Sequence, residues 1–505
     1  MMPAVRSLRA ALAALAFLCV LSPASRADGL EALIIGGGPT PQDNQVAIES
    51  NVRYLLRLLP SGAPRTVLFA DGDPQSKTVL FEKKSKELAA AEKVLALLLQ
   101  GPESWRPATY QFRVPTIPKI DGPAKRAGVD AAFERMRGGA RGASNPLLLY
   151  FTGHGSANRQ RNLDNNVFDL WGEQLSVKDL AQQISALPPD RPVALVMVQC
   201  YSGAFGNLLF QGGDPAAETV ENDIAGFFAT VKEKMAAGCT PAVDERDYKD
   251  FSTYFFAALT GKDRVGRAVT GADYNHDGRV GMDEAFCYTL VHNATIDIPV
   301  CTSDVFLRRF VTLPDSEIFK TSYAQVKEWA TPAQRSALDE LSIAVGLSGD
   351  DRVQNAWSRF RDETESRQRA ARLDASRRGF WVIREEERNA LFARWPDLKD
   401  PQANAYAAAK AEALMWVRRR AEEGKYAELL DGEKKQLDEE RAAFEREITD
   451  ARLIRLVRLS KTVILSHAVR TSADDSVKRR FEKLVTAEQR SLLPWQGAAR
   501  AAHRP

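Results

Sequence analysis

Residues 147–156 read LLLYFTGHGS, and this stretch decides the fold that we expect. Its first five residues form an unbroken apolar run, which is typical of a parallel strand buried on both faces. A second run of this kind, VALVMV at residues 193–198, is followed after one glutamine by Cys200. Between the two runs, residues 176–187 have helical spacing, with Ser176 as the expected N-cap. This succession predicts a parallel sheet with helical connections.

The alternation extends on both sides of these strands. From about residue 30 to 310, short apolar runs at 33–35, 66–70 and 227–231 alternate with segments of helical spacing at 46–59, 83–100 and 128–137. Beyond about residue 315 the chain is dense in charge, and it has no convincing strand and no cysteine. We therefore predict an α/β domain at 28–315, with a mostly parallel sheet between helical layers, followed by an all-α region at 316–505.

The composition excludes several classes of protein. Of 505 residues, 44% are hydrophobic and 27% charged, which is too apolar for a disordered chain. A formal net charge of only +3 gives no bulk attraction to nucleic acid or anionic lipid, and the basic clusters at 418–420 and 478–480 adjoin acidic residues. No nucleic-acid partner is therefore expected. The glycines at 36–38 do not match a dinucleotide loop, so no organic cofactor is expected.

The first 27 residues have the pattern of a signal peptide. Arg6 and Arg9 precede an apolar run of 12 residues at 10–21, which is too short to span a bilayer. Small residues at Ser25 and Ala27 fit a cleavage site. No later apolar run reaches 18 residues, so we expect an extracytoplasmic protein, periplasmic or secreted, without a membrane span after cleavage. The alternative is a short membrane anchor.

The cysteines fit this compartment without forming a disulfide scaffold. After signal cleavage, Cys200, Cys239, Cys287 and Cys301 remain. If Cys200 stays free for chemistry, the simplest arrangement is one disulfide and one buried thiol. Cys239 and Cys301 both lie in loop-like surroundings and are the favoured pair, whereas Cys287 falls inside a helical pattern.

A histidine and a cysteine follow the two most apolar runs directly. His154 and Cys200 would stand at the carboxyl ends of parallel strands, where ligands bind in open α/β sheets. A free thiol is mostly protonated at neutral pH, and an adjacent imidazole can take its proton and later return it to a leaving amine. The amide groups of Gly155 and Cys200 are natural oxyanion donors. The alternative is a capping histidine beside a buried core thiol.

The two blocks YFTGHGS at 150–156 and VQCYSG at 198–203 resemble the active-site blocks of the legumain-like and caspase-like cysteine peptidases, a superfamily that includes gingipain and clostripain. The resemblance covers roughly residues 30–310. It implies a caspase-like αβα sandwich, with His154 as general base and acid and Cys200 as the nucleophile that forms a thioester acyl-enzyme. The expected function is that of an exported cysteine endopeptidase acting on protein or peptide substrates. Alternatives are an inactive binding or scaffold module with the same fold, and a transpeptidase that uses the same dyad.

The resemblance also points to residues that bind the substrate. In legumain, an acidic residue two before the nucleophile and an arginine near the N-terminal strand help to bind asparagine, and the matching positions here are Val198 and Asp43. A further acidic pocket residue of the family matches Asp250. Two carboxylates without a cation favour a basic P1 side chain. The alternative is that Asp43 and Asp250 are surface caps.

Residues 273–284 fit the twelve-residue EF-hand template. The oxygen ligands that the template requires are Asp273, Asn275, Asp277, the carbonyl of Arg279, and Glu284 as the closing bidentate carboxylate. Gly278 allows the sharp turn at the sixth position, and a helix follows from Met282, but glycines make an entering helix doubtful. We therefore predict a single EF-hand-like loop that binds Ca²⁺ and fixes the cleft wall near residues 250–300. The alternative is an acidic surface turn.

The region at 316–505 reads from its own sequence only as charged helices with a solvated face. Legumain carries a helical C-terminal region that restrains its active site. By that analogy, residues 321–505 are expected to cap the cleft or to bind a partner.

Overall fold

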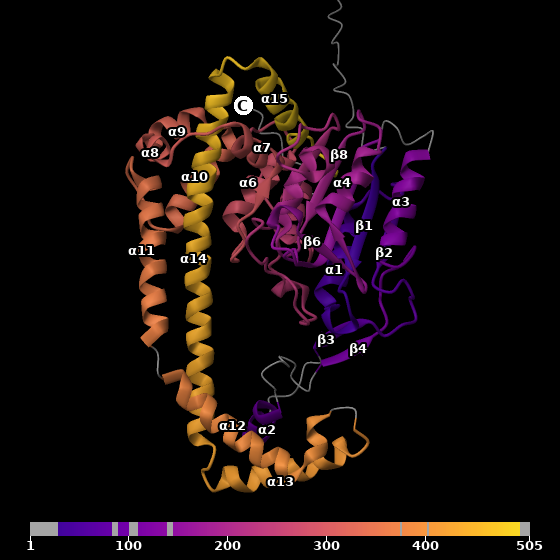
Figure 1. Ribbon diagram of the computed structural model, residues 1–505, viewed down its shortest axis with the longest axis vertical. Coiled ribbons are helices and arrows are strands. Elements are labelled where there is room, and N and C mark those ends of the chain that lie inside the picture. Colours follow the sequence, from indigo (N-terminus) through magenta and orange to yellow (C-terminus); the bar gives the residue numbers. More distant parts are fainter. Residues whose placement is uncertain are drawn as a thin grey trace, which may run out of the picture.

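The computed structural model describes residues 29–82, 89–99, 110–138, 145–373, 376–400 and 403–494 (Figure 1). The predicted signal peptide lies outside these residues. The central sheet has the strand order β10-β9-β8-β5-β1-β2. Its strands are β1 (Glu31–Gly37), β2 (Arg65–Phe69), β5 (Leu147–Ser156), β8 (Val193–Met197), β9 (Ile224–Phe228) and β10 (Val300–Cys301). All neighbours pair in parallel except β10, which is antiparallel to β9.

The apolar runs form strands because helices cover both faces of the sheet. Along β5, Leu148 and Tyr150 face one hydrophobic core, whereas Leu149 and Phe151 face the other. The first core takes residues from α1 (Val46–Leu58), α5 (Phe251–Thr260) and α6 (Met282–His292), and the second takes residues from α3 (Arg126–Gly138) and α4 (Val177–Ser185). Ser176 caps α4 as predicted. The chain is therefore α/β with a mostly parallel central sheet.

Two short antiparallel pairs of strands accompany the main strand order of the central sheet. β6 (Val167–Leu170) and β7 (Glu173–Ser176) form a hairpin that pairs with the last residues of β5. β3 (Val79–Glu82) and β4 (Tyr110–Arg113) form a separate antiparallel pair. The first hairpin keeps the His154 segment extended beyond the end of the central sheet.

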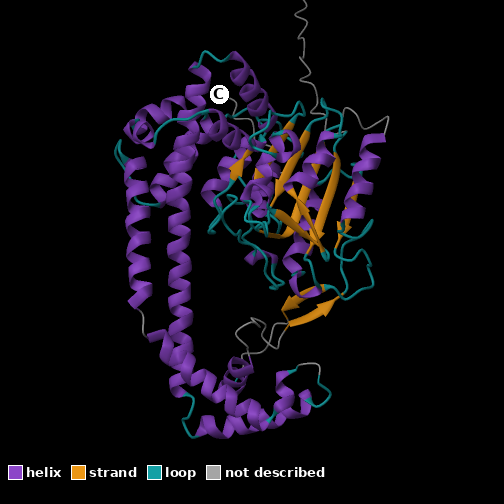
Figure 2. Cartoon of the chain, viewed as in Figure 1, coloured by secondary structure: helices purple, strands orange, loops and turns teal. Residues whose placement is uncertain are grey.

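The C-terminal region is helical, and no strand occurs among its described residues. Figure 2 shows the strands gathered on one side of the molecule, with the long helices beside them. The chain reaches this region through α7 (Thr302–Phe310), which follows β10 in the α/β region. The helices of the C-terminal region are α8 (Asp315–Lys320), α9 (Tyr323–Trp329), α10 (Pro332–Ala344), α11 (Arg352–Leu373), α12 (Ser376–Arg394), α13 (Tyr406–Glu422), α14 (Ala427–Thr471) and α15 (Asp475–Glu488).

These helices are not a unit packed separately from the sheet. Leu456 and Val463 of α14 belong to the same hydrophobic core as Ile34 and Phe227 of the sheet. After α14, the chain turns back, so that α15 packs against β9 and α7 (Figure 1). The boundary expected near residue 315 separates two sequence patterns, but residues on both sides of it share one hydrophobic core.

A second contact joins the two regions far from the sheet. The predicted helix at 83–100 is observed as α2 (Ala90–Leu99), and it packs against α12 and α13. Val94 and Leu98 of α2 share a separate core with Leu391 and Val417. Among the described residues, no helix is both long and apolar enough to cross a membrane.

Candidate active site and calcium loop

His154 and Cys200 stand at the ends of neighbouring parallel strands. In the β5–β8 pair, Leu147 lies opposite Val193 and Phe151 lies opposite Met197. The same offset along the chain separates His154 from Cys200, so the pairing register carries both residues to the same level of the sheet edge. Sequence reasoning placed these two residues together, and the strand pairing brings their backbones side by side.

Gly155 is where these two backbones come closest. A Cβ atom at this position would lie 2.4 Å from the Cys200 carbonyl oxygen and 2.6 Å from Cγ of Gln199. Any side chain would therefore force the cysteine segment away from β5. The close approach gives Gly155 a packing reason to be glycine, and its predicted role as an oxyanion donor stays a prediction.

The imidazole of His154 is held by the segment that follows β1. Its Nε2 lies 2.8 Å from the Asp43 carbonyl oxygen and 2.9 Å from Oε1 of Gln45. A carbonyl oxygen can only accept, so this contact assigns the proton to Nε2 and leaves Nδ1 as the basic nitrogen. Asp43 thus contributes through its main chain, while its carboxylate accepts a hydrogen bond from the Thr40 hydroxyl.

The thiol of Cys200 is half-buried and lies against one backbone segment. The Ala236 amide donates to Sγ at 3.3 Å, and Sγ lies 3.7 Å from the Ala236 carbonyl oxygen. Burial raises the pKa of the Cys200 thiol to about 11, and the Ala236 amide only partly offsets this effect. The thiol is therefore protonated at neutral pH, and nucleophilic attack needs a base.

A tight turn follows the cysteine. Tyr201 has a φ of 59°, which is uncommon for a residue with a side chain, and its amide donates to the Lys234 carbonyl at 2.8 Å. The segment from Lys234 to Ala236 thus holds both Cys200 and the turn after it.

The predicted disulfide between Cys239 and Cys301 is wrong. All four cysteines of the described chain are free. Cys301 is buried in β10, with its Sγ 3.3 Å from Oγ of Ser303, whereas Cys239 is exposed and its Sγ lies 3.8 Å from the Gly153 carbonyl oxygen. Cys287 is buried in α6, as predicted. The site therefore has a second thiol, next to the residue that precedes His154.

Two of the three residues predicted to bind the substrate, Val198 and Asp250, are buried. Val198 is 6% exposed and belongs to the core of the sheet. Asp250 is 1% exposed, caps α5 by accepting from the Thr253 amide, and forms an ion pair with Arg264 at 3.3 Å. The premise that no cation accompanies the carboxylates is wrong, because Arg264 compensates Asp250 inside the protein.

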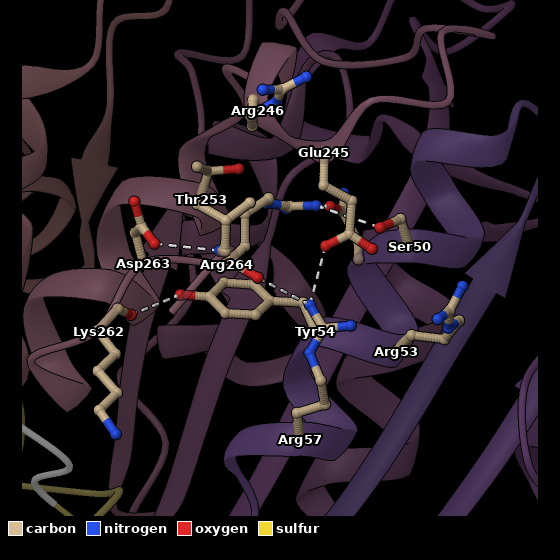
Figure 3. A network of polar contacts seen from close by, with 12 residues as sticks. Ser50, Arg53, Tyr54, Arg57, Glu245, Arg246, Thr253, Lys262, Asp263 and Arg264 are labelled. Atoms are coloured by element: carbon tan, nitrogen blue, oxygen red, sulfur yellow. Dashed lines mark hydrogen bonds and ion pairs between the residues drawn. The ribbon is translucent and has the colours of Figure 1, made fainter. Parts of the chain in front are cut away.

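Arg264 is the centre of a buried polar network behind the site (Figure 3). Its guanidinium carbon lies 4.9 Å from the ring centre of Tyr54 and 5.0 Å from that of Tyr248. It also donates to the Asn51 side chain, which in turn donates to the hydroxyl of Thr152 at 3.0 Å. Because Thr152 precedes His154 by two residues, the network fixes α1 to the end of β5.

The outer part of this network ties α1 to the segments before and after α5. The Tyr54 hydroxyl donates to the Lys262 carbonyl at 3.1 Å, and Arg57 forms an ion pair with Glu245 at 2.9 Å (Figure 3). Burial is the main reason that the pKa of Tyr54 lies above its ordinary value. Tyr54 is thus a neutral donor at neutral pH.

The loop at 273–284 has much of the backbone geometry of its template. Gly278 has a φ of 87°, and its amide donates to Oδ2 of Asp273 at 3.2 Å. The Asp277 amide donates to Oδ1 of Asn275, and the Arg279 amide donates to Oδ1 of Asp277. The predicted helix after the loop is α6, whereas α5 ends at Thr260 and no helix enters the loop directly.

The oxygen donors of this loop suit Ca²⁺ in their chemistry. Oδ1 of Asp273 is buried and has no hydrogen-bond partner, so a hard cation would satisfy it. The Glu284 carboxylate instead accepts from the amides of Tyr274, Asn275 and Gly281. Within the part of the chain that is described, no three His, Cys, Asp or Glu side chains converge closely enough to hold a metal. Cation binding would therefore require Glu284 to turn towards Asp273.

A cavity of about 510 Å³ lies beside the cysteine turn. The α/β side lines it with Tyr201 and with residues 233–235, and the helical region lines it with Phe360 of α11 and Glu447 of α14. The cavity thus joins the surroundings of Cys200 to the C-terminal helices.

No protein-family model matches this chain, and no curated protein matches it. The fold class and the paired strand ends of His154 and Cys200 therefore carry the functional argument.

Proposed function

We propose that this protein is an exported cysteine endopeptidase with a caspase-like fold that cleaves proteins or peptides outside the cytoplasm. The observation that carries this proposal is the position of His154 and Cys200 at the carboxyl ends of the adjacent strands β5 and β8. The Asp43 carbonyl, which orients the imidazole, adds the third group that a nucleophile and its base need.

In the proposed reaction, Nδ1 of His154 takes the proton of the Cys200 thiol as Sγ attacks the scissile carbonyl carbon. Burial raises the pKa of the thiol to about 11, so the attack needs the imidazole as base. The amides of Gly155 and Cys200 receive the oxyanion. The C–N bond then breaks, and His154 gives its proton to the leaving amine. Water attacks the thioester with His154 again as base, the C–S bond breaks, and His154 returns the proton to Sγ as the acid product leaves.

The buried ion pair of Asp250 with Arg264 removes the argument for a basic P1 side chain. We therefore propose cleavage of a peptide bond, and the proposal names no preferred P1 residue. A positional-scanning peptide library, run with wild type and Cys200→Ala, gives the P1 preference directly.

We propose that the C-terminal helices form a wall of the substrate groove. The cavity between Tyr201 and Phe360 supports this reading, since a polypeptide leaving the nucleophile on that side would contact α11 and α14. Phe360→Ala is expected to raise KM for long peptides and to leave short peptides unaffected. An equal rise in KM for long and short peptides would contradict the proposal that Phe360 lines a substrate groove.

We also propose that the loop at 273–284 binds one structural Ca²⁺ through Asp273, Asn275, Asp277, Arg279 and Glu284. Ca²⁺ at ten times its Kd is expected to stabilise the protein by about 1.4 kcal/mol, and Asp273→Asn should abolish the effect. Asp263→Asn is the control, because this carboxylate lies outside the loop and pairs with Arg267. If Ca²⁺ does not change the melting temperature of the wild-type protein, the loop does not bind this ion.

Labelling with a peptidyl acyloxymethyl ketone tests the catalytic proposal. Wild type is expected to be labelled on Cys200, whereas His154→Ala and Cys200→Ala are not. Cys239→Ala is the matched control, since it removes the other thiol near the site. Labelling that survives His154→Ala, or that falls on Cys239, favours the inactive scaffold. Transfer of the acyl group to an added amine in preference to water would indicate the transpeptidase.

A further inference from the structure

Arg455 is a buried arginine of the C-terminal helix α14, and its guanidinium is surrounded by carbonyl groups. The side chain is 1% exposed. Its nitrogens donate to the Leu290 carbonyl in the last turn of α6 at 3.1 Å. They also donate to three carbonyls of the segment between α6 and β10, those of Asn293 at 2.6 Å, Thr295 at 2.8 Å and Asp297 at 2.7 Å. One side chain of the helical region thus fixes the course of residues 290–297.

This segment in turn holds the backbone that contacts the thiol. Asp297 is fully buried, and its Oδ1 accepts from the Ala237 amide at 2.7 Å. The preceding residue, Ala236, donates its own amide to Sγ of Cys200 at 3.3 Å. A continuous series of contacts therefore runs from Arg455 through Asp297 and the 236–237 backbone to Cys200.

We propose that Arg455 is a positioning residue for the nucleophile, because it fixes the 290–297 segment that holds the Ala236 amide on the Cys200 thiol. This inference rests on the proposed role of Cys200. It makes the C-terminal helical region part of the active site rather than a cap over it.

The charge of Asp297 also acts on the thiol, in the opposite sense to its hydrogen bond with Ala237. Asp297 and Cys239 are the titratable neighbours that oppose ionisation of the Cys200 thiol, and the Ala236 amide favours it. Burial raises the pKa of Asp297 to about 6, and Arg455 counters part of that rise. Arg455 thus stabilises the carboxylate that accepts from Ala237, and it acts on the thiol only through the intervening backbone.

The rate of alkylation of Cys200 by iodoacetamide, measured against pH in the full chain, tests this role. Arg455→Gln is expected to slow alkylation about tenfold at pH 8 and to move its pH profile upward, as expected for a weakened hydrogen bond to a charged group. Arg455→Lys should recover part of the rate, because its ammonium can still reach up to three carbonyls.

Arg458→Gln is the matched control. Arg458 lies about one turn further along α14 and pairs with Asp304 of α7 at 2.7 Å, away from residues 290–297. Its replacement is expected to leave the alkylation profile unchanged. If Arg458→Gln slows alkylation as much as Arg455→Gln does, the effect is a general loosening of α14, and the positioning role is wrong.

Asp297→Ala provides a second test from the other end of the series, and it decides the matter if Arg455→Gln does not fold. It removes the acceptor of the Ala237 amide but also a negative charge that opposes ionisation of the thiol, so it is compared with Asp297→Asn, which removes the charge and keeps an acceptor oxygen. Asp297→Ala should be alkylated more slowly than Asp297→Asn, and equal rates in the two folded variants would overturn the proposal. Alkylation requires no peptide hydrolysis. If wild type cleaves no peptide while Arg455→Gln still slows alkylation, the peptidase proposal fails and the positioning role stands.

Discussion

Replacement of Glu488 by alanine is expected to destabilise the whole protein, because this residue joins the last helix to the sheet region. Glu488 ends α15 and is 4% exposed. Its Oε1 accepts from the Thr302 hydroxyl and the Ser303 amide, both at 2.7 Å, and its Oε2 accepts from the Ser303 hydroxyl at 2.6 Å. These donors begin α7, directly after β10. A carboxylate from the C-terminal region thus satisfies the buried amide end of α7, a helix of the α/β region.

The size of the destabilisation by Glu488→Ala follows from the hydrogen bonds that the carboxylate accepts. Alanine leaves three buried donors without an acceptor, at about 1–3 kcal/mol each. The carboxylate is itself costly to bury, and burial raises the pKa of Glu488. Relief of that cost offsets part of the loss, so the net destabilisation is expected to be about 3 kcal/mol. Glu488→Gln keeps the size and one acceptor oxygen, so it should lose only about 1 kcal/mol.

The pH dependence of this effect has a definite sign. The pKa of Glu488 is higher in the folded chain than in the unfolded one, so folding favours its protonated form. The contribution of the residue is therefore greatest in acid, and it is lost as the pH rises through the folded pKa. The advantage of wild type over Glu488→Gln should shrink as the pH is raised from acid to neutral.

Urea unfolding, followed by far-UV circular dichroism and tryptophan fluorescence together, measures these differences. Glu482→Ala is the control, since Glu482 lies on the same helix and forms an exposed ion pair with Arg470 at 2.8 Å. It should change stability by no more than about 0.5 kcal/mol. If Glu488→Ala loses less than about 1 kcal/mol, or no more than the control, this carboxylate does not lock α15 to the sheet region.

Three further outcomes are expected. Gly155→Ala should destabilise the protein by about 2 kcal/mol in thermal unfolding and slow the alkylation of Cys200, because the new Cβ would lie 2.4 Å from the Cys200 carbonyl oxygen. The alkylation rate of wild type should rise steadily from pH 7 to 10, since the thiol pKa is about 11, and a plateau below pH 8 would indicate a preformed thiolate. Arg264→Met should lose about 3–5 kcal/mol in urea unfolding because it leaves Asp250 buried without its cation, whereas the exposed Arg267→Met should lose less than about 1 kcal/mol.

The sequence predicts the strands of the sheet because a strand buried on both faces has to be apolar at every position. The run at 147–151 is confirmed as the start of β5, and the run at 193–198 is confirmed as β8 as far as Met197. What the pattern misses is that β5 continues to Ser156. Residues 152–156 are polar or small, and they remain extended because the β6–β7 hairpin pairs with them. Such pairing depends on the tertiary structure and leaves no local signature.

The two side chains proposed for chemistry are visible in the sequence, whereas the groups that orient them are not. The Asp43 carbonyl holds His154, and the Ala236 amide holds Cys200. Main-chain groups are present at every residue, so no residue type marks them. The one available signal for the first contact is position, since Asp43 follows the glycines at the carboxyl end of β1, the strand next to β5.

The density of charge in the C-terminal region does not predict which of its charged residues are buried. Its density of lysine, arginine and glutamate predicts a solvated helical face, yet Arg455 and Glu488 are almost fully buried. Each is satisfied by groups more than 150 positions earlier in the chain. A local pattern cannot distinguish such residues from their exposed neighbours, because the partners become adjacent only when the sheet and the helices pack together.

Both buried charges contact the same short part of the α/β region. Arg455 holds residues 290–297, and Glu488 holds Thr302 and Ser303, so the two contacts flank β10 on either side. β10 pairs with β9, and the segment after β9 carries Ala236 to the thiol of Cys200. A shift of α14 or α15 relative to the sheet would therefore act on the backbone that contacts Cys200. For this reason the placement of the C-terminal helices and the reactivity of the Cys200 thiol are expected to change together.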